Sequence, residues 1–230
     1  QHAQQQLDGL QSFYDRLESK LQTTVNFKTP ILRKFFSIEE QNDWFAASDK
    51  PGLSEFLSTQ LITQKYPGID SPFDYGQVMQ TGWVDTGLLL QSYRNYLKAH
   101  QMFVAESFDC NAVIYQNDGI VYKNIQARHL VFAQGFGIKS NSYFNNLPLN
   151  GTKGELLIIK AAELQLDTII KGNVFIVPLG NDLFKVGATY EWEDKTNSPT
   201  EKGKQELVEK LAEILNCDYE VVSHQAGIRP

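Results

Sequence analysis

An arginine near the end of the sequence is the residue best suited to bind a charged ligand. Arg229 follows Ala226-Gly-Ile228, a short apolar stretch typical of the end of a buried strand. Its planar guanidinium can hold a carboxylate through two parallel, charge-assisted hydrogen bonds. The other interpretation is an ordinary surface arginine, and the residue taken alone favours that one.

Three further side chains could share a pocket with such an arginine. Tyr190 follows Val186-Gly-Ala-Thr189 and could face the same space, although a tyrosine at the rim of a hairpin is an equally good interpretation. Phe175 begins a predicted strand and is better suited to an apolar wall than to chemistry. His224 could titrate near neutral pH, but histidines in such places are more often structural.

Composition argues against several functional classes. The 230 residues carry a net charge of −6 without a cluster of Lys and Arg, which disfavours nucleic acid or an acidic membrane surface as a partner. No apolar run is long enough to cross a membrane, and no signal peptide is recognisable. Cys110 and Cys217 are far apart and the histidines are scattered, so we expect no metal site, no disulfide and a cytoplasmic location.

Hydrophobic periodicity predicts helices and strands in irregular alternation. Apolar residues between Leu7 and Leu21 fall on one helical face, and those between Thr200 and Leu215 form another such stripe. Ser37-Ile-Glu-Glu40 is a capping box, Asp85 can cap a further helix, and Asn117-Asp-Gly119 is a hairpin turn. The expected extended segments are 25–36, 102–107, 112–115, 120–122, 129–133, 155–159, 174–177, 183–189 and 219–223. The predicted class is α+β, or mixed α/β.

Several short segments occur in an informative order along the chain. They are Gly82-Trp-Val-Asp85, the extended stretch 103–113, Ala127 to Gly135, Phe175-Ile-Val-Pro178, Val186-Gly-Ala-Thr189 and Ala226-Gly-Ile-Arg-Pro230. Each is weak alone. Together they resemble the FAD-dependent oxidoreductases of the D-amino-acid oxidase and glycine oxidase type, over nearly the whole chain and most specifically from Gly82 onward.

The resemblance implies a two-domain enzyme whose domains are each assembled from separated segments. One is a Rossmann-type FAD-binding domain, to which the helix in 1–26 and the segment 82–140 would belong. The other is a substrate domain with helices and a large mixed β-sheet, which 27–81 and 141–230 would build.

The same resemblance implies roles for individual residues. Arg229 would bind the substrate carboxylate, with Tyr190 and Phe175 in the same pocket. The backbone at Val113 would meet the adenine end of FAD. Ala133 and Gly135 would let the chain pass close to the cofactor, because a larger side chain would collide with it.

The sequence also departs from the family pattern. It contains no Gly-x-Gly-x-x-Gly turn for the pyrophosphate and no glycine-rich segment after Pro230, and it has Phe175 where many relatives have tyrosine. We therefore expect a fragment of a longer enzyme that by itself holds no FAD and is inactive.

The expected function is that of the substrate-binding portion of an FAD-dependent oxidoreductase. The enzyme would oxidise the C–N bond of an amine or amino acid to an imine, with hydride passing to the flavin. Since the protein mainly positions the substrate, no residue is assigned to acid–base catalysis. The alternatives are a flavin dehydrogenase with an acceptor other than oxygen and a non-catalytic ligand-binding α+β module. The strand expected at 129–133 would have an exposed edge, which favours association with a second copy.

Overall fold

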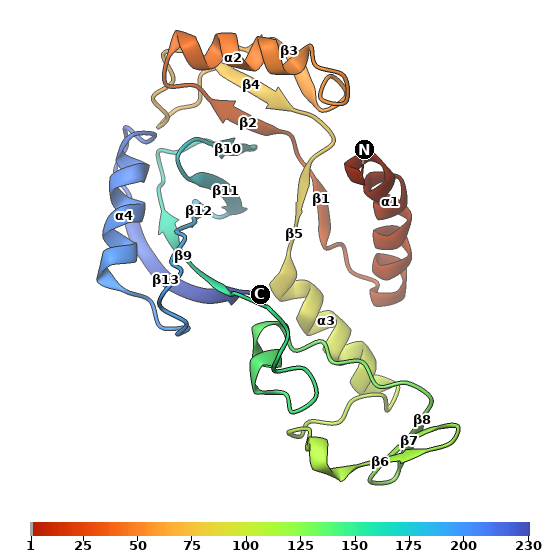
Figure 1. Ribbon diagram of the computed structural model, residues 1–230. Helices are drawn as coiled ribbons and strands as arrows, with labels where there is room; N and C mark the ends of the chain where they lie inside the picture. The colour runs from red at the N-terminus through yellow and green to blue at the C-terminus, as the bar shows by residue number, and fades with distance from the viewer. Residues whose placement is uncertain (1) are drawn as a thin grey trace. The chain divides into compact units, whose positions relative to one another are not determined.

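The computed structural model describes the backbone of residues 2–230 and the side chains of residues 5–230 (Figure 1). Gln1, at the start of the predicted 1–26 segment, lies outside the described residues. The α-helices are α1 (His2–Leu21), α2 (Ile38–Ser48), α3 (Thr86–Ala99) and α4 (Glu201–Ala212), and the 3-10 helices are η1 (Cys110–Ala112) and η2 (Gly135–Ser140). The strands are β1 (Asn26–Lys28), β2 (Ile31–Lys34), β3 (Leu57–Ile62), β4 (Tyr75–Val78), β5 (Gly82–Val84), β6 (Val113–Gln116), β7 (Gly119–Tyr122), β8 (Ile125–Ala127), β9 (Thr152–Lys160), β10 (Ile169–Lys171), β11 (Phe175–Gly180), β12 (Leu183–Gly187) and β13 (Glu220–Arg229).

The chain forms two compact units, each built from separated segments. The first unit contains the residues up to Phe103 together with Glu155–Thr189 and Pro199–Gln225. The second contains Val104–Gly154, Tyr190–Ser198 and Ala226–Pro230. The domain boundaries that the sequence suggests, after residues 26, 81 and 140, stay predictions.

The largest sheet has eight strands in the order β13-β9-β12-β11-β10-β2-β4-β3. β2 and β10 run parallel, with Ile31 opposite Ile169. The neighbours β9 and β12, β11 and β12, and β2 and β4 run antiparallel. The sheet is therefore mixed, which confirms the predicted mixed α/β class with a large mixed β-sheet.

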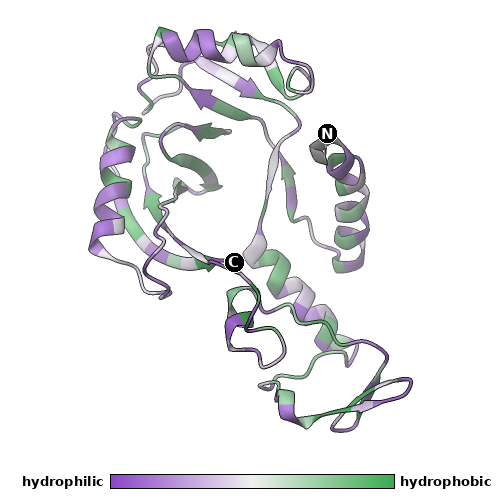
Figure 2. Ribbon diagram, in the orientation of Figure 1, coloured by the Kyte–Doolittle hydropathy of each residue, from purple (hydrophilic) through white to green (hydrophobic). Residues whose placement is uncertain are grey.

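The core of the first unit lies between this sheet and α4. Leu157 and Ile159 of β9 are fully buried, as are Leu207 and Leu211, which lie one turn apart on α4. Figure 2 shows mainly hydrophilic residues along α4, with hydrophobic ones at intervals, as expected of a helix that buries one face. Thr200 caps this helix by accepting a hydrogen bond from the Gly203 N–H. The predicted helix between Thr200 and Leu215 is thus confirmed.

Helix α2 packs closely on β4 because one residue of that strand is a glycine. A Cβ on Gly76 would lie within 2.7 Å of the Trp44 ring, so the indole rests directly on the strand backbone. The Trp44 Nε1–H donates to the Ser58 carbonyl at 2.9 Å. The capping box is confirmed: the Ser37 hydroxyl accepts from the Glu40 N–H at 3.3 Å, and the Glu40 carboxylate accepts from the Phe36 N–H at 3.1 Å.

The second unit contains a small three-stranded sheet in the order β6-β7-β8. Gln116 pairs with Gly119, so the predicted hairpin at Asn117-Asp118 is confirmed. Beside it, Phe108 stacks on Tyr122 with ring centres 4.4 Å apart and meets Phe132 edge-on at 5.7 Å.

Two of the expected strands are wrong. Residues 102–107 and 129–133 form no strand, and Val131 is 83% exposed. An apolar run becomes a strand only where a neighbouring strand accepts its backbone hydrogen bonds, and no strand of the described residues pairs with either segment. The basis for expecting association of two copies through residues 129–133 is lost with the strand.

Replacing Leu207 with alanine should strongly destabilise the first unit. The side chain is fully buried between α4 and the sheet, so its removal loses apolar burial and leaves a cavity. We expect a cost of about 2–5 kcal/mol in the free energy of unfolding, measured by urea denaturation. Gln205→Ala, at an exposed position of the same helix, should change it by less than about 0.5 kcal/mol. Equal losses in the two variants would contradict this account of the core.

Candidate functional site

Two of the residues singled out in the sequence, Arg229 and Tyr190, lie together in the second unit. Arg229 ends β13, is half-buried, and has its guanidinium carbon 4.5 Å from the centre of the Tyr190 ring. Such a contact is a cation–π interaction, which attracts the guanidinium to the ring face. We call Arg229, Tyr190 and the intervening Gly154 the arginine site.

Gly154 belongs to the arginine site because the guanidinium lies over its backbone. A Cβ placed on Gly154 would be 2.5 Å from Arg229 Cζ and 2.6 Å from Nη1, well inside van der Waals contact. Lys153 and Glu191 exchange backbone hydrogen bonds of 2.8 and 2.9 Å, which brings Tyr190 to the position across from Gly154. Sequence reasoning did not predict the contact between Gly154 and Arg229; the only signal was a glycine between two charged residues.

A fully buried lysine fixes the segment that carries Tyr190. The Lys153 Nζ donates to Asp194 Oδ2 at 2.5 Å, to the Ser198 carbonyl at 2.5 Å and to Thr196 Oγ1 at 3.3 Å. The hydrogen bond from Lys153, helped by those from Thr196, lowers the pKa of Asp194 from its usual 3.8 to about 2. Because a buried ammonium needs an anion and acceptors, this pair ties residues 190–198 to β9.

Glu155, the next charged residue of β9, has a structural environment in the first unit. Its buried carboxylate accepts from the Thr200 N–H at 2.9 Å and from the Thr200 hydroxyl at 2.8 Å. His224 Nε2 lies 2.7 Å from Glu155 Oε2. A carboxylate at the start of a helix interacts favourably with the helix dipole, so Glu155 stabilises the beginning of α4. His224, which contacts the same carboxylate, has a structural environment.

Phe175 begins β11 in the first unit and makes apolar contacts. It pairs in register with Gly187, and its ring edge lies 3.1 Å from the position that a Gly187 Cβ would take. This placement suits the apolar wall expected of Phe175.

The residues predicted to meet FAD all belong to the second unit. Val113 is half-buried at the start of β6, and Ala133 is exposed in the irregular segment. Gly135 opens η2 with φ +54°, which favours glycine, and the space where its Cβ would be is open. Small residues with accessible backbone are compatible with close approach of a cofactor, so these residues fit a partial FAD site.

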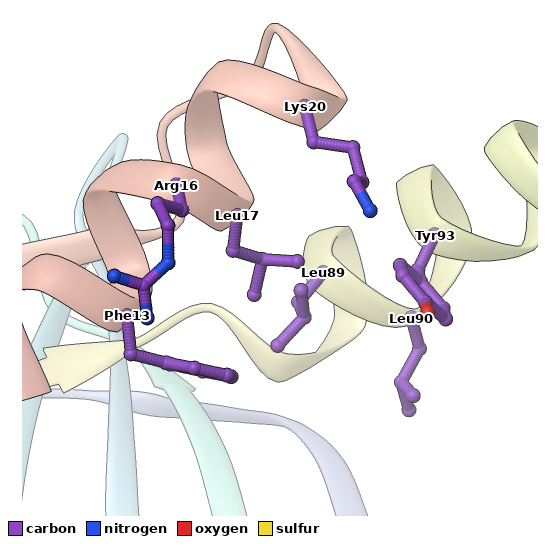
Figure 3. A pocket seen from close by; sticks show the side chains of 7 residues that line it. All are labelled: Phe13, Arg16, Leu17, Lys20, Leu89, Leu90 and Tyr93. Atoms are coloured by element: carbon purple, nitrogen blue, oxygen red, sulfur yellow. The ribbon is translucent and has the colours of Figure 1, made fainter.

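Two grooves of the first unit are lined by residues of α1 and its neighbours. Figure 3 shows Phe13 and Leu17 of α1 facing Leu89 of α3, in a groove of about 580 Å³ that Leu90 and Tyr93 also line. A second groove of about 630 Å³ lies along α1, β1 and β5. Neither is lined by Arg229, Tyr190 or Phe175.

The described residues contain neither a cluster of metal ligands nor a helix that could span a membrane. Within residues 2–230, no three His, Cys, Asp or Glu side chains gather as a metal site would require. No described helix combines the length and apolar character needed to cross a membrane. Cys110 and Cys217 are free thiols.

Comparison with known proteins defines the class of this chain. The sequence model of the FAD dependent oxidoreductase family matches residues 2–230, and the chain belongs to that family. It is similar to the glycine oxidase of Bacillus subtilis, with 27% identity over 176 residues that make up 69% of this chain and 47% of the relative. The chain thus spans about half the length of this curated relative.

Solved structures share the fold. Glycine oxidase from Bacillus cereus superposes with a TM-score of 0.77 at 17% identity, covering 99% of this chain and 68% of that one. Glycine oxidase from Geobacillus kaustophilus gives a TM-score of 0.72 at 16% identity, covering 99% and 66%. The fold predicted by the resemblance is confirmed.

The Lys153–Asp194 pair should make stability depend on pH in acid. Because the folded-state pKa of Asp194 lies near 2, below its usual 3.8, its stabilising contribution is complete above about pH 4 and is lost as the pH falls towards 2. We expect Asp194→Asn to lower the urea midpoint at neutral pH, and the gap between parent and variant to close as the pH falls through this range. Asp218→Asn, at an exposed position, is the matched control. A gap that stays constant down to pH 2 would refute the pairing.

Proposed function

We propose that this chain is the substrate-binding portion of an FAD-dependent oxidoreductase that oxidises the C–N bond of an amine or amino acid to an imine. Family membership supports the reaction class, and the glycine oxidases among the similar proteins favour a small amino acid as substrate. The observation that carries the proposal is the arginine site, where a half-buried guanidinium lies against an aromatic face.

The geometry of this contact is compatible with carboxylate binding by Arg229. The Arg229 Cζ lies over the Tyr190 ring, 4.5 Å from its centre, and the N–H bonds of a guanidinium point outward in the plane of the group. The contact restricts where the guanidinium lies, and we propose that its N–H groups hold the substrate carboxylate through two parallel hydrogen bonds. A substrate carboxylate held in this way would be fixed in both position and direction.

The flavin supplies the redox chemistry in this class of enzyme by accepting a hydride from the substrate carbon next to nitrogen. The residues of this chain bind and orient the substrate, with Arg229 on the carboxylate and Phe175 as an apolar wall. Val113, Ala133 and Gly135 are proposed to lie along FAD. Because the printed sequence has no Gly-x-Gly-x-x-Gly turn, we propose that FAD binding and activity require further parts of the protein.

Arg229→Lys tests the carboxylate site in the full-length protein. Lysine keeps the charge but loses the planar two-point grip. Losing one charge-assisted hydrogen bond should cost about 1.5–3 kcal/mol of substrate binding, which is roughly ten- to hundred-fold in KM for an amino acid. Steady-state kinetics on an amino acid and on the corresponding amine without the carboxylate would measure the effect.

The amine without a carboxylate should respond little to Arg229→Lys, and the flavin spectrum should not change. Arg94→Lys, at an exposed position of α3, is the matched control and should leave both substrates unaffected. If amino acid and amine lose activity equally, or if neither loses any, Arg229 is structural and the amino-acid substrate is refuted.

A further inference from the structure

We propose that Gly154 and Tyr190 are positioning residues for Arg229. Because Gly154 has no side chain, the Arg229 side chain can lie directly over the backbone of β9. The Tyr190 ring then holds the guanidinium in place. The pair would thus set the direction from which a carboxylate can be bound. This inference rests on the proposed function for the identity of the ligand, but its central contact is testable without any substrate.

The three residues lie in a row across neighbouring chain segments of the second unit. β13, which ends at Arg229, is next to β9 in the sheet. The Lys153–Glu191 bridge on β9 puts Tyr190 opposite Gly154. The arginine side chain therefore starts on one side of Gly154 and reaches the aromatic ring on the other.

Space, rather than backbone conformation, explains the glycine at position 154. Gly154 is not among the glycines with positive φ, so an L-residue could adopt its backbone conformation. All three nearest neighbours of an added Cβ are atoms of the Arg229 guanidinium. Glycine inside a strand is otherwise unfavourable and often marks the close approach of another group. Here the approaching group is the arginine.

The same geometry makes Gly154→Ala an informative change. The three atoms nearest to the added methyl all belong to the far end of a long, flexible side chain, and none of them is a backbone atom. The guanidinium can move away at little cost, so the fold should survive while the arginine loses its position. An effect on ligand binding would then not be a consequence of unfolding.

Tyr190 acts in this arrangement through its ring face. The side chain is 69% exposed, so core packing does not account for it, and its ring centre lies 4.5 Å from the guanidinium carbon. Phenylalanine at this position keeps the aromatic face, whereas leucine removes it. Tyr190→Phe and Tyr190→Leu therefore separate positioning by the ring from any function of the hydroxyl.

The first measurement is the NMR signal of the Arg229 Nε–Hε group in the full-length protein, assigned by its loss in Arg229→Lys. We expect Gly154→Ala to shift this signal because the guanidinium moves out of the ring current of Tyr190. Tyr190→Leu should shift it because the ring itself is absent. Tyr190→Phe should leave it nearly in place. Gly227→Ala is the matched control on β13, since a Cβ there meets nothing within 4 Å. Thermal unfolding should be unchanged in Gly154→Ala.

The second measurement is the KM for an amino acid and for the amine without its carboxylate. Gly154→Ala and Tyr190→Leu should raise the KM for the amino acid roughly tenfold, as expected for one lost charge-assisted hydrogen bond, and leave that of the amine unchanged. Gly227→Ala, whose added Cβ meets nothing within 4 Å, should behave as the parent.

The outcomes distinguish this inference from the proposed function. If Arg229→Lys raises the KM for the amino acid but Gly154→Ala changes neither that KM nor the NMR signal, positioning by Gly154 is overturned and the proposed function stands. If Gly154→Ala shifts the signal while no variant affects KM, the positioning contact is supported and the carboxylate-binding function is overturned.

Discussion

The arginine site depends on one ion pair, between the buried Lys153 and the half-buried Asp194. The Lys153 side chain has no exposure to solvent, so its ammonium must find an anion and hydrogen-bond acceptors within the protein. Asp194 and the Ser198 carbonyl provide them. By satisfying that charge, residues 190–198 are held against β9, and Tyr190 is placed across from Gly154. An interaction that does no chemistry thus determines where the aromatic ring beside Arg229 lies.

Alternation along β9 separates the buried charges of Lys153 and Glu155 from the arginine that lies over Gly154. Side chains of a strand point alternately to its two faces, so Lys153 and Glu155 share one face and the glycine between them belongs to the other. The buried face carries the contacts of Lys153 with Asp194 and of Glu155 with Thr200. The opposite face, at Gly154, meets Arg229. Lys153 and Glu155 can therefore make their buried contacts without occupying the space that Arg229 needs over Gly154.

The fold is shared with glycine oxidases although few residues are identical. At 17% identity the TM-score with the Bacillus cereus enzyme is 0.77. Such a relation is expected when a fold is specified mainly by which positions are apolar, because cores tolerate many substitutions that conserve pattern and volume. Function depends instead on a few side chains, and the structure brings Arg229, Tyr190 and Gly154 into contact.

Features that depend on near neighbours in the chain could be predicted from the amino-acid sequence. The helical stripe before Leu215, the capping residues Ser37 and Asp85 and the hairpin at Asn117-Asp118 were all predictable, because each depends on spacings of a few residues. Arg229 and Tyr190 could be proposed from residue type and order, but their contact could not, since the two are far apart in sequence.

Features that depend on partners far apart in the sequence became visible only in the folded chain. The apolar run 129–133 forms no strand because no strand of the described residues pairs with it. Lys153 and Asp194, 41 positions apart, become an ion pair only once the chain is folded. The reason for a glycine at position 154 is the Arg229 guanidinium that lies over it. The sequence alone does not show which group occupies the space beside a glycine.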